Sequence, residues 1–164
     1  MTLQLTSELQ LERALVAAGE RHIAHTVEVS GAPHAVVYMD NVAHASNEAI
    51  QRLGSAIRHH PDFPQGINVN FVEVLDRHTL WQRTFERGVE GETLACGTGA
   101  VASSIVSALL GKVDTPVRLH VLGGELSVAF SRSGDTFDDL HLGGGAWFVA
   151  EGVLHPEAWN WRAP

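Results

Sequence analysis

The sequence predicts an α+β fold in which mainly antiparallel strands wrap around one central, buried helix. The helix is expected at 97–110, a run of small and apolar residues without a single charged side chain. A helix that lacks a polar face is buried on every side. The segments before and after it are short, alternate apolar with polar residues and are separated by glycine or proline, which is typical of strands.

Local signals along the chain predict the other elements. Ser7 and Gln10 resemble a capping box and Gly19 a stop signal, so a helix is expected at 7–18. Apolar residues recur at helical spacing over 46–60, which predicts a second helix. Strands are expected at 26–29, 35–39, 67–75, 79–85, 117–122, 125–131, 138–142 and 147–150.

Composition excludes several classes of function. A chain of 164 residues that is 45% hydrophobic can bury one good core. Its formal charge of -8 argues against nucleic acid as a partner. One cysteine excludes an internal disulfide and fits a reducing compartment, so we expect the cytoplasm. The start of the chain lacks the features of a signal peptide, and no apolar run is long enough to span a membrane.

Ten histidines raise the question of a metal site. They are scattered, and no pair shows the i, i+4 spacing with a nearby carboxylate that marks a zinc protease. We therefore expect no metal and interpret most of the histidines as surface or structural residues.

The only cysteine, Cys96, lies between an acidic, glycine-rich loop and the helix expected at 97–110. A lone cysteine in a soluble protein is more often a small buried hydrophobe than a reactive group. At a helix start, however, free N–H groups and the helix dipole favour the thiolate and can also hold a carboxylate. Gly97 and Gly99 would let another group approach the backbone closely. We therefore expect Cys96 to be alkylated faster than a free thiol at neutral pH.

Residues 83–100, R-T-F-E-R-G-V-E-G-E-T-L-A-C-G-T-G-A, resemble the C-terminal signature of the diaminopimelate epimerase family. Three further runs follow in the family's order: G-A-P-H-A-V-V-Y at 31–38, F-P-Q-G-I-N-V-N-F-V-E-V at 63–74 and L-G-G-E-L-S-V at 122–128. The resemblance covers about 29–152. Residues 1–28 are then interpreted as a remnant of the region between domains, and 153–164 as a C-terminal tail. In this family the region of 7–18 is usually strand and loop, which competes with the helix expected there.

The resemblance implies a complete enzyme of two pseudo-symmetric domains, each a barrel-like sheet around a helix that begins with a cysteine. This chain is similar to the second domain, and the first domain's C-G-N-G motif does not occur in it. Epimerisation without a cofactor removes the α-proton from one face and returns a proton to the other, so it needs two acid–base groups. The expectation is a half-enzyme for diaminopimelate. Its partner would be a separate N-terminal domain chain or a second copy in a homodimer.

By the same resemblance, Cys96 is one catalytic acid–base group and Glu86 is the carboxylate that exchanges a proton with it. Replacing Glu86 by Gln is then expected to slow alkylation of the thiol. Arg87 would pair with a substrate carboxylate, for which its planar fork is suited. Gly97 and Thr98 would donate hydrogen bonds to a carboxylate at the helix start.

The resemblance assigns two more residues and shows two departures. His34 would assist the cysteine of the missing domain, the alternative being a loop histidine bonded to backbone. Asn68 corresponds to the family's asparagine in the N-V-N-F strand and would bind substrate. Glu90 adds a residue to the loop, which is expected to bulge while the site survives. Ala32 stands where the family often has a substrate-binding asparagine, and this leaves open whether diaminopimelate itself is the substrate.

Two other functions compete with this interpretation. The chain could belong to a related racemase or isomerase. Cys96 argues against the cysteine-free phenazine-type isomerases, and the E-R-G…C-G-T-G pattern argues against proline racemases. It could also be a non-catalytic binding or assembly module. Exchange of a substrate α-proton in deuterated water would separate an enzyme from a module.

Overall fold

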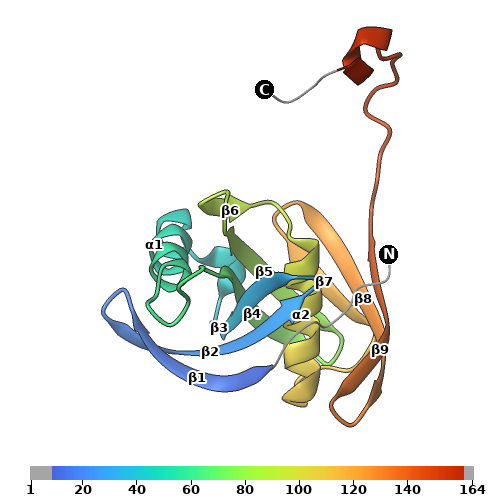
Figure 1. The fold of residues 1–164 in the computed structure, drawn as a ribbon. Helices are drawn as coiled ribbons and strands as arrows, with labels where there is room; N and C mark the ends of the chain where they lie inside the picture. Colours follow the sequence, from blue (N-terminus) through green and yellow to red (C-terminus); the bar gives the residue numbers. More distant parts are fainter. Residues whose placement is uncertain (1–8, 161–164) are drawn as a thin grey trace.

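In the computed structural model, which describes residues 9–160, one mixed nine-stranded sheet curls around a central helix (Figure 1). The elements are, in chain order, β1 (Gln10–Ala17), β2 (Glu20–Val29), β3 (Ala32–Tyr38), the 3₁₀ turn η1 (Val42–His44), α1 (Asn47–Arg58), β4 (Asn68–Asp76), β5 (Thr79–Glu86), β6 (Gly91–Thr93), α2 (Gly97–Leu109), β7 (Val117–Val121), β8 (Gly124–Ser133), β9 (Thr136–Gly144) and the 3₁₀ turn η2 (Pro156–Asn160). The expected α+β class, with strands around one buried helix, is confirmed.

The order of the strands is β1-β2-β3-β4-β5-β7-β8-β9, and β6 is added beside β5. Neighbouring strands are antiparallel except in the pairs β3–β4 and β5–β7. Parallel strands need a crossover connection. The first crossover contains α1 and the second contains β6 and α2, so the two helices enter the fold at its two parallel pairs.

The central strands are buried on both faces because each face carries a helix. Side chains of a strand alternate between the two faces of a sheet. Val36 and Val72 accordingly belong to the core around α2, whereas their neighbours Val37 and Phe71 belong to the core around α1. This alternation also decides which polar side chains of β3, β4 and β5 meet the start of α2.

Helix α1 confirms the helix expected at 46–60. Its N-cap is Ser46, whose side chain accepts a hydrogen bond from the Ala49 N–H at 3.1 Å. Its buried face packs on β4 and β5. The packing is close at Gly54, where an added Cβ would lie 2.6 Å from the Cβ of Phe85.

The helix expected at 7–18 is wrong over its described part, because residues 10–17 form strand β1. Ala18 and Gly19 both have positive φ, 52° and 85°, and they connect β1 to β2 as a two-residue hairpin turn. Leu15 and Ala17 point into the core around α1, so pairing and burial override helix propensity here. Ser7 lies outside the described residues. The resemblance suggested a boundary between residues 28 and 29. This position lies within strand β2 (Glu20–Val29), so the sheet continues across it.

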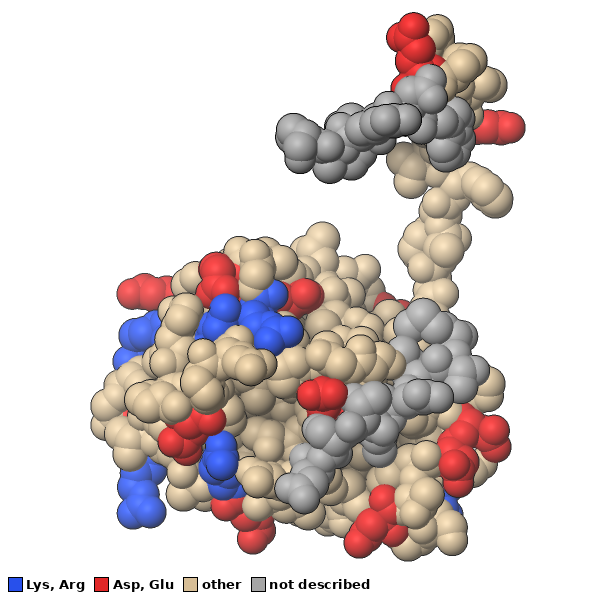
Figure 2. Space-filling view, viewed as in Figure 1, with Lys and Arg blue, Asp and Glu red and all other residues tan. Residues whose placement is uncertain are grey.

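The strand expected at 147–150 is also wrong, since these residues are extended but do not pair with the sheet. Beyond β9 the chain leaves the domain and stands clear of it (Figures 1 and 2). Its large apolar side chains are exposed: Trp147 (83%), Phe148 (106%), Val149 (94%), Val153 (101%) and Leu154 (62%). We refer to residues 145–154 as the apolar tail.

No helix in the described part of the chain is long and apolar enough to cross a membrane.

Candidate functional site

The sheet presents polar instead of apolar side chains to α2 at the end where this helix begins. His34 comes from β3, Asn68 and Asn70 from β4, and Thr84 and Glu86 from β5. The strand register places His34 opposite Asn68 and Asn70 opposite Thr84. Because residues two apart share a face, the whole group faces the helix start.

Cys96 is the N-cap residue of α2 and only 8% exposed. Burial raises the pKa of its thiol, and the charge and hydrogen bond of Glu86 act in the same direction. The Gly99 N–H and the Thr98 hydroxyl lower this pKa but do not outweigh burial. The expected helix-start donors are therefore present, while the expectation of a thiolate-favouring environment is wrong.

Glu86 lies close enough to Cys96 for its carboxylate to raise the pKa of the thiol. Strand β5 ends at Glu86 and brings it back to the helix start, ten positions before the cysteine. Its Oε1 also accepts a short hydrogen bond from Thr93 Oγ1 on β6. The expected placement of Cys96 at a helix start is confirmed, and Glu86 lies near enough to act on its thiol.

His34 is completely buried, and its ring is held by two side chains rather than by backbone. Nε2 lies 3.0 Å from Thr98 Oγ1, and Nδ1 lies 3.2 Å from Asn70 Nδ2. Burial lowers the pKa of His34 to about 4, and the positive charge of Arg87 adds to this. The ring is therefore neutral at physiological pH.

Asn68 ties the loop that carries Arg87 to strand β3. Its Nδ2 donates to the Pro33 carbonyl at 3.0 Å, and its Oδ1 accepts from the Arg87 N–H at 2.9 Å. In the described part of the chain the Arg87 guanidinium donates hydrogen bonds only to backbone, to the carbonyls of Gln65 and Gly66 at 3.4 and 3.5 Å. In the described residues, no carboxylate forms an ion pair with the planar cation of Arg87.

Glu90, the extra residue of the loop, lies in the turn 87–90 between β5 and β6 and fastens this turn to α1. Its φ is 57°, and its N–H donates to the Glu86 carbonyl at 2.9 Å. Its carboxylate accepts from the Gly88 N–H and pairs with Arg58 at 2.8 Å. The additional residue therefore braces the loop that ends at Cys96.

Sequence reasoning missed Asn70, Thr84 and Gln82, which lie behind the expected site residues. Asn70 is fully buried, and an alanine Cβ at Gly99 would lie 2.3 Å from its Oδ1. The signal that could have found them is the spacing. Two asparagines two apart in the otherwise apolar run 67–72 place both amides on one buried face.

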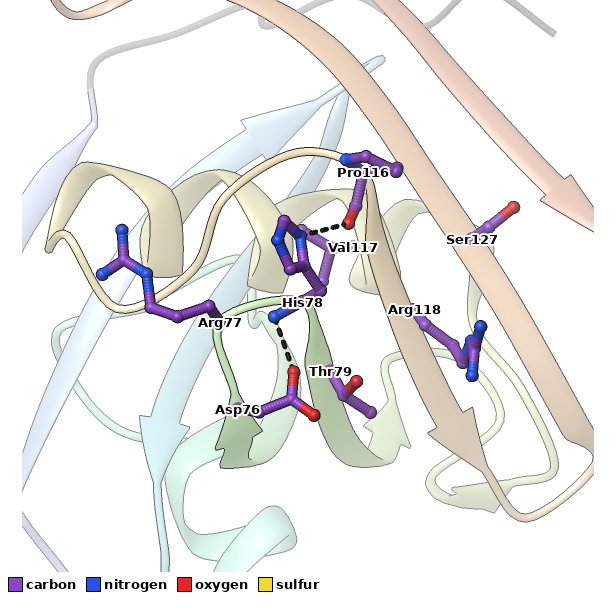
Figure 3. Close-up of a pocket in the computed structure, with 8 residues that line it drawn as sticks. All are labelled: Asp76, Arg77, His78, Thr79, Pro116, Val117, Arg118 and Ser127. Carbon is purple, nitrogen blue, oxygen red and sulfur yellow. Dashed lines mark hydrogen bonds between the residues drawn. The ribbon is translucent and has the colours of Figure 1, made fainter.

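A hollow of about 770 Å³ lies elsewhere, at the β4–β5 turn (Figure 3). Arg77 at its edge donates to the carbonyl of Gly111, just beyond the C-terminal end of α2 and so at the opposite end from Cys96. Its polar side chains support the turn: Asp76 accepts from the His78 N–H, and the His78 ring contacts the Pro116 carbonyl. Among residues 9–160, no group of three His, Cys, Asp or Glu side chains could hold a metal ion.

The profile of the diaminopimelate epimerase family matches residues 26–143. Among curated relatives, the diaminopimelate epimerase of Cupriavidus taiwanensis is 43% identical over 124 residues, covering 76% of this chain and 41% of that protein. The diaminopimelate epimerase of Aquifex aeolicus is 42% identical over 149 residues, covering 89% of this chain and 51% of that protein. The chain thus spans about half the length of the curated relatives that it matches.

Two solved structures share the fold at 15% sequence identity. One is a hydroxyproline epimerase from Agrobacterium vitis with bound trans-4-hydroxy-L-proline, with a TM-score of 0.58 over 85% of this chain and 46% of that one. The other is a probable proline racemase from Agrobacterium radiobacter K84 with bound carbonate, with a TM-score of 0.54 over 96% of this chain and 54% of that one.

Proposed function

The chain belongs to the diaminopimelate epimerase family, and from this premise we propose that it forms one half of an amino-acid epimerase site. The substrate class is diaminopimelate or a close analogue, and the reaction serves lysine and cell-wall precursor synthesis in the cytoplasm. The observation that carries the proposal is the single thiol, Cys96, held at the start of α2 near the Glu86 carboxylate, which raises its pKa.

In this proposal Cys96 and Glu86 share one proton. With the proton on sulfur, the thiol can donate it to the α-carbon of a substrate carbanion. In the reverse direction Glu86 accepts the thiol proton, and the thiolate removes the α-proton. A group on one face can only return a proton to that face. Inversion therefore needs a second group opposite Cys96, and this two-base chemistry uses no cofactor.

The substrate carboxylate would bind between Arg87 and the start of α2. The guanidinium can form a bidentate pair with it. The first N–H groups of the helix, at Gly97 and Thr98, can donate to the same anion. Asn68 supports this arrangement by holding the Arg87 backbone.

The second acid–base group would come from a complementary domain that docks over Cys96. The chain spans only 41–51% of two curated relatives. The apolar tail extends past the end of the domain at which α2 begins (Figure 1). A domain docked at that end would therefore lie beside the apolar tail. Contiguous apolar surface of this kind marks an interaction site. A second copy of the chain is the alternative. Equilibrium sedimentation separates the two, since a single 17.7 kDa species at micromolar concentration excludes a homodimer.

The substrate class is tested by protection of the thiol. Because Cys96 is the only cysteine, iodoacetamide labels one site. We expect diaminopimelate to slow alkylation of the wild-type chain, and L-proline at equal concentration not to. Replacing Arg87 by Gln should reduce the protection. Equal protection by both amino acids, or none by either, would contradict the proposed substrate.

A further inference from the structure

A chain of buried side-chain hydrogen bonds runs from the interior of β5 to the sulfur of Cys96. Four of its members are at most 2% exposed: Gln82, Thr84, Asn70 and His34. The successive contacts are Gln82 Nε2 to Thr84 Oγ1 (3.1 Å), Thr84 Oγ1 to Asn70 Oδ1 (3.0 Å), Asn70 Nδ2 to His34 Nδ1 (3.2 Å), His34 Nε2 to Thr98 Oγ1 (3.0 Å) and Thr98 Oγ1 to Cys96 Sγ (3.7 Å).

The direction of this chain follows from one carbonyl. Asn70 Nδ2 also lies 3.2 Å from the carbonyl oxygen of Ala35, which can only accept. The amide nitrogen must therefore be on that side, and its other hydrogen points at His34 Nδ1. Since Nδ1 then accepts, the proton of the neutral ring is on Nε2. Burial, which lowers the pKa of His34 to about 4, keeps the ring in this neutral form.

The remaining hydrogens are fixed in turn. His34 Nε2–H donates to Thr98 Oγ1, so the threonine's own hydrogen is free to point at Cys96 Sγ. At the other end Thr84 donates to Asn70 and accepts from Gln82. Every donor in the chain is directed toward the sulfur, and hydrogen bonds aligned in this way strengthen one another.

We propose that Asn70 is a positioning residue for Cys96: it fixes the tautomer of His34 and, through that ring, aims the threonine hydroxyl at the sulfur. The hydroxyl stabilises the thiolate, whereas Glu86 stabilises the thiol. The balance between the two forms is then set from two sides. The inference deepens the proposed function, because it concerns the same thiol, but it is tested without any turnover.

Few ionisable groups face the sulfur from the elements packed around it. Strand β5 brings Glu86, and β3 brings the neutral His34, on which the charge of Arg87 acts. Strand β4 brings only amides, and β9 brings Leu142 beside the helix start. The midpoint of the pH profile of Cys96 alkylation therefore reports the ionisation of the thiol, with few other groups near the sulfur titrating.

The test is the midpoint of that pH profile, measured with iodoacetamide. Thr98→Val keeps the shape and removes the hydroxyl, so the midpoint should rise by about one pH unit, a tenfold loss of thiolate at a given pH. Thr98→Ser restores the donor and should return the midpoint to the wild-type value. Asn70→Leu should raise the midpoint in the same direction by a smaller amount, and Asn70→Ser is a second variant if the leucine does not fold.

The double variant distinguishes positioning from a general structural effect. If Asn70 acts through Thr98, then Asn70→Leu combined with Thr98→Val shifts the midpoint no further than Thr98→Val alone. Ser107→Ala is the matched control. Ser107 lies on the same helix but away from the sulfur, and the change removes its 2.7 Å hydrogen bond to Tyr38 of β3. An unchanged midpoint in Thr98→Val, fully additive shifts in the double variant, or an equal shift in the control would overturn the proposal.

Discussion

Replacing Gly99 by alanine tests how closely α2 must approach the sheet at the site. Two effects oppose each other. Alanine is favoured over glycine in a helix by up to about 1 kcal/mol. The added Cβ, however, would lie 2.3 Å from Asn70 Oδ1 and 3.2 Å from Cys96 Sγ. Asn70 cannot move aside freely, because hydrogen bonds to His34, Ala35 and Thr84 hold it.

Overpacking a well-packed interior costs about 1–3 kcal/mol, and one broken buried hydrogen bond costs about 1 kcal/mol more. The steric cost of the added methyl group therefore exceeds the stability gained from the higher helix propensity of alanine. We expect Gly99→Ala to destabilise the fold by about 2 kcal/mol, which lowers the melting temperature of a chain of this size by about 4–8 °C.

The assay is thermal unfolding followed by circular dichroism, with Gly97→Ala as the matched control. A Cβ at Gly97 would meet the end of the Leu142 side chain at 2.7 Å, and a methyl group of this kind can rotate away. The control should stay within about 1 kcal/mol of the wild type. If Gly99→Ala melted at or above the wild-type temperature, the helix propensity of alanine would outweigh the steric cost. The close contact between α2 and Asn70 would then be refuted.

Three further predictions concern charge and capping. In Glu86→Gln the alkylation midpoint of Cys96 should move to lower pH, because the carboxylate adds to burial in raising the pKa of this thiol; this reverses the sequence-based expectation, and slower alkylation at pH 7 would contradict it. Ser46→Ala should lower the free energy of unfolding by about 1 kcal/mol through loss of the α1 cap, and urea unfolding with an unchanged midpoint would count against it. Burial lowers the pKa of His34 from 6.5 to about 4, so the unfolded chain binds a proton in this window that the folded chain does not. The free energy of unfolding should be highest above pH 6.5 and fall by on the order of 3 kcal/mol as the pH drops to 4, and His34→Gln should reduce this fall; an equal fall in the variant would exclude His34 as its source.

Much of the fold could be predicted from the sequence, because burial leaves a pattern in it. The uncharged run at 97–110 predicted the central helix, and alternation predicted most strands. The errors lie where local and tertiary signals conflict. Residues 7–18 have helix propensity and end signals, but pairing of β1 with β2 decides their structure. The apolar residues at 147–150 resemble a buried strand, yet nothing in the described chain covers them.

The sequence identified the site residues that lie in recognisable motifs, but not the environment that the fold builds around them. Motif residues gave Cys96 and Glu86, and the structure places them together. The protonation state was mispredicted, because the helix start is visible in the sequence while the depth of burial is not. Asn70 and Thr84 were missed for a related reason. Their importance comes from cross-strand register, which brings together residues fourteen positions apart in sequence.

The central claim is that this chain holds one acid–base group of a two-group site. It is tested most directly by incubating the chain with LL-diaminopimelate in deuterated water and following both the deuterium content and the configuration of the α-carbon. We predict slow incorporation of deuterium with retention of configuration, abolished by Cys96→Ser. Inversion by the chain alone at a rate typical of enzymes, on the order of 10 per second, or exchange that persists without the thiol, would contradict the claim.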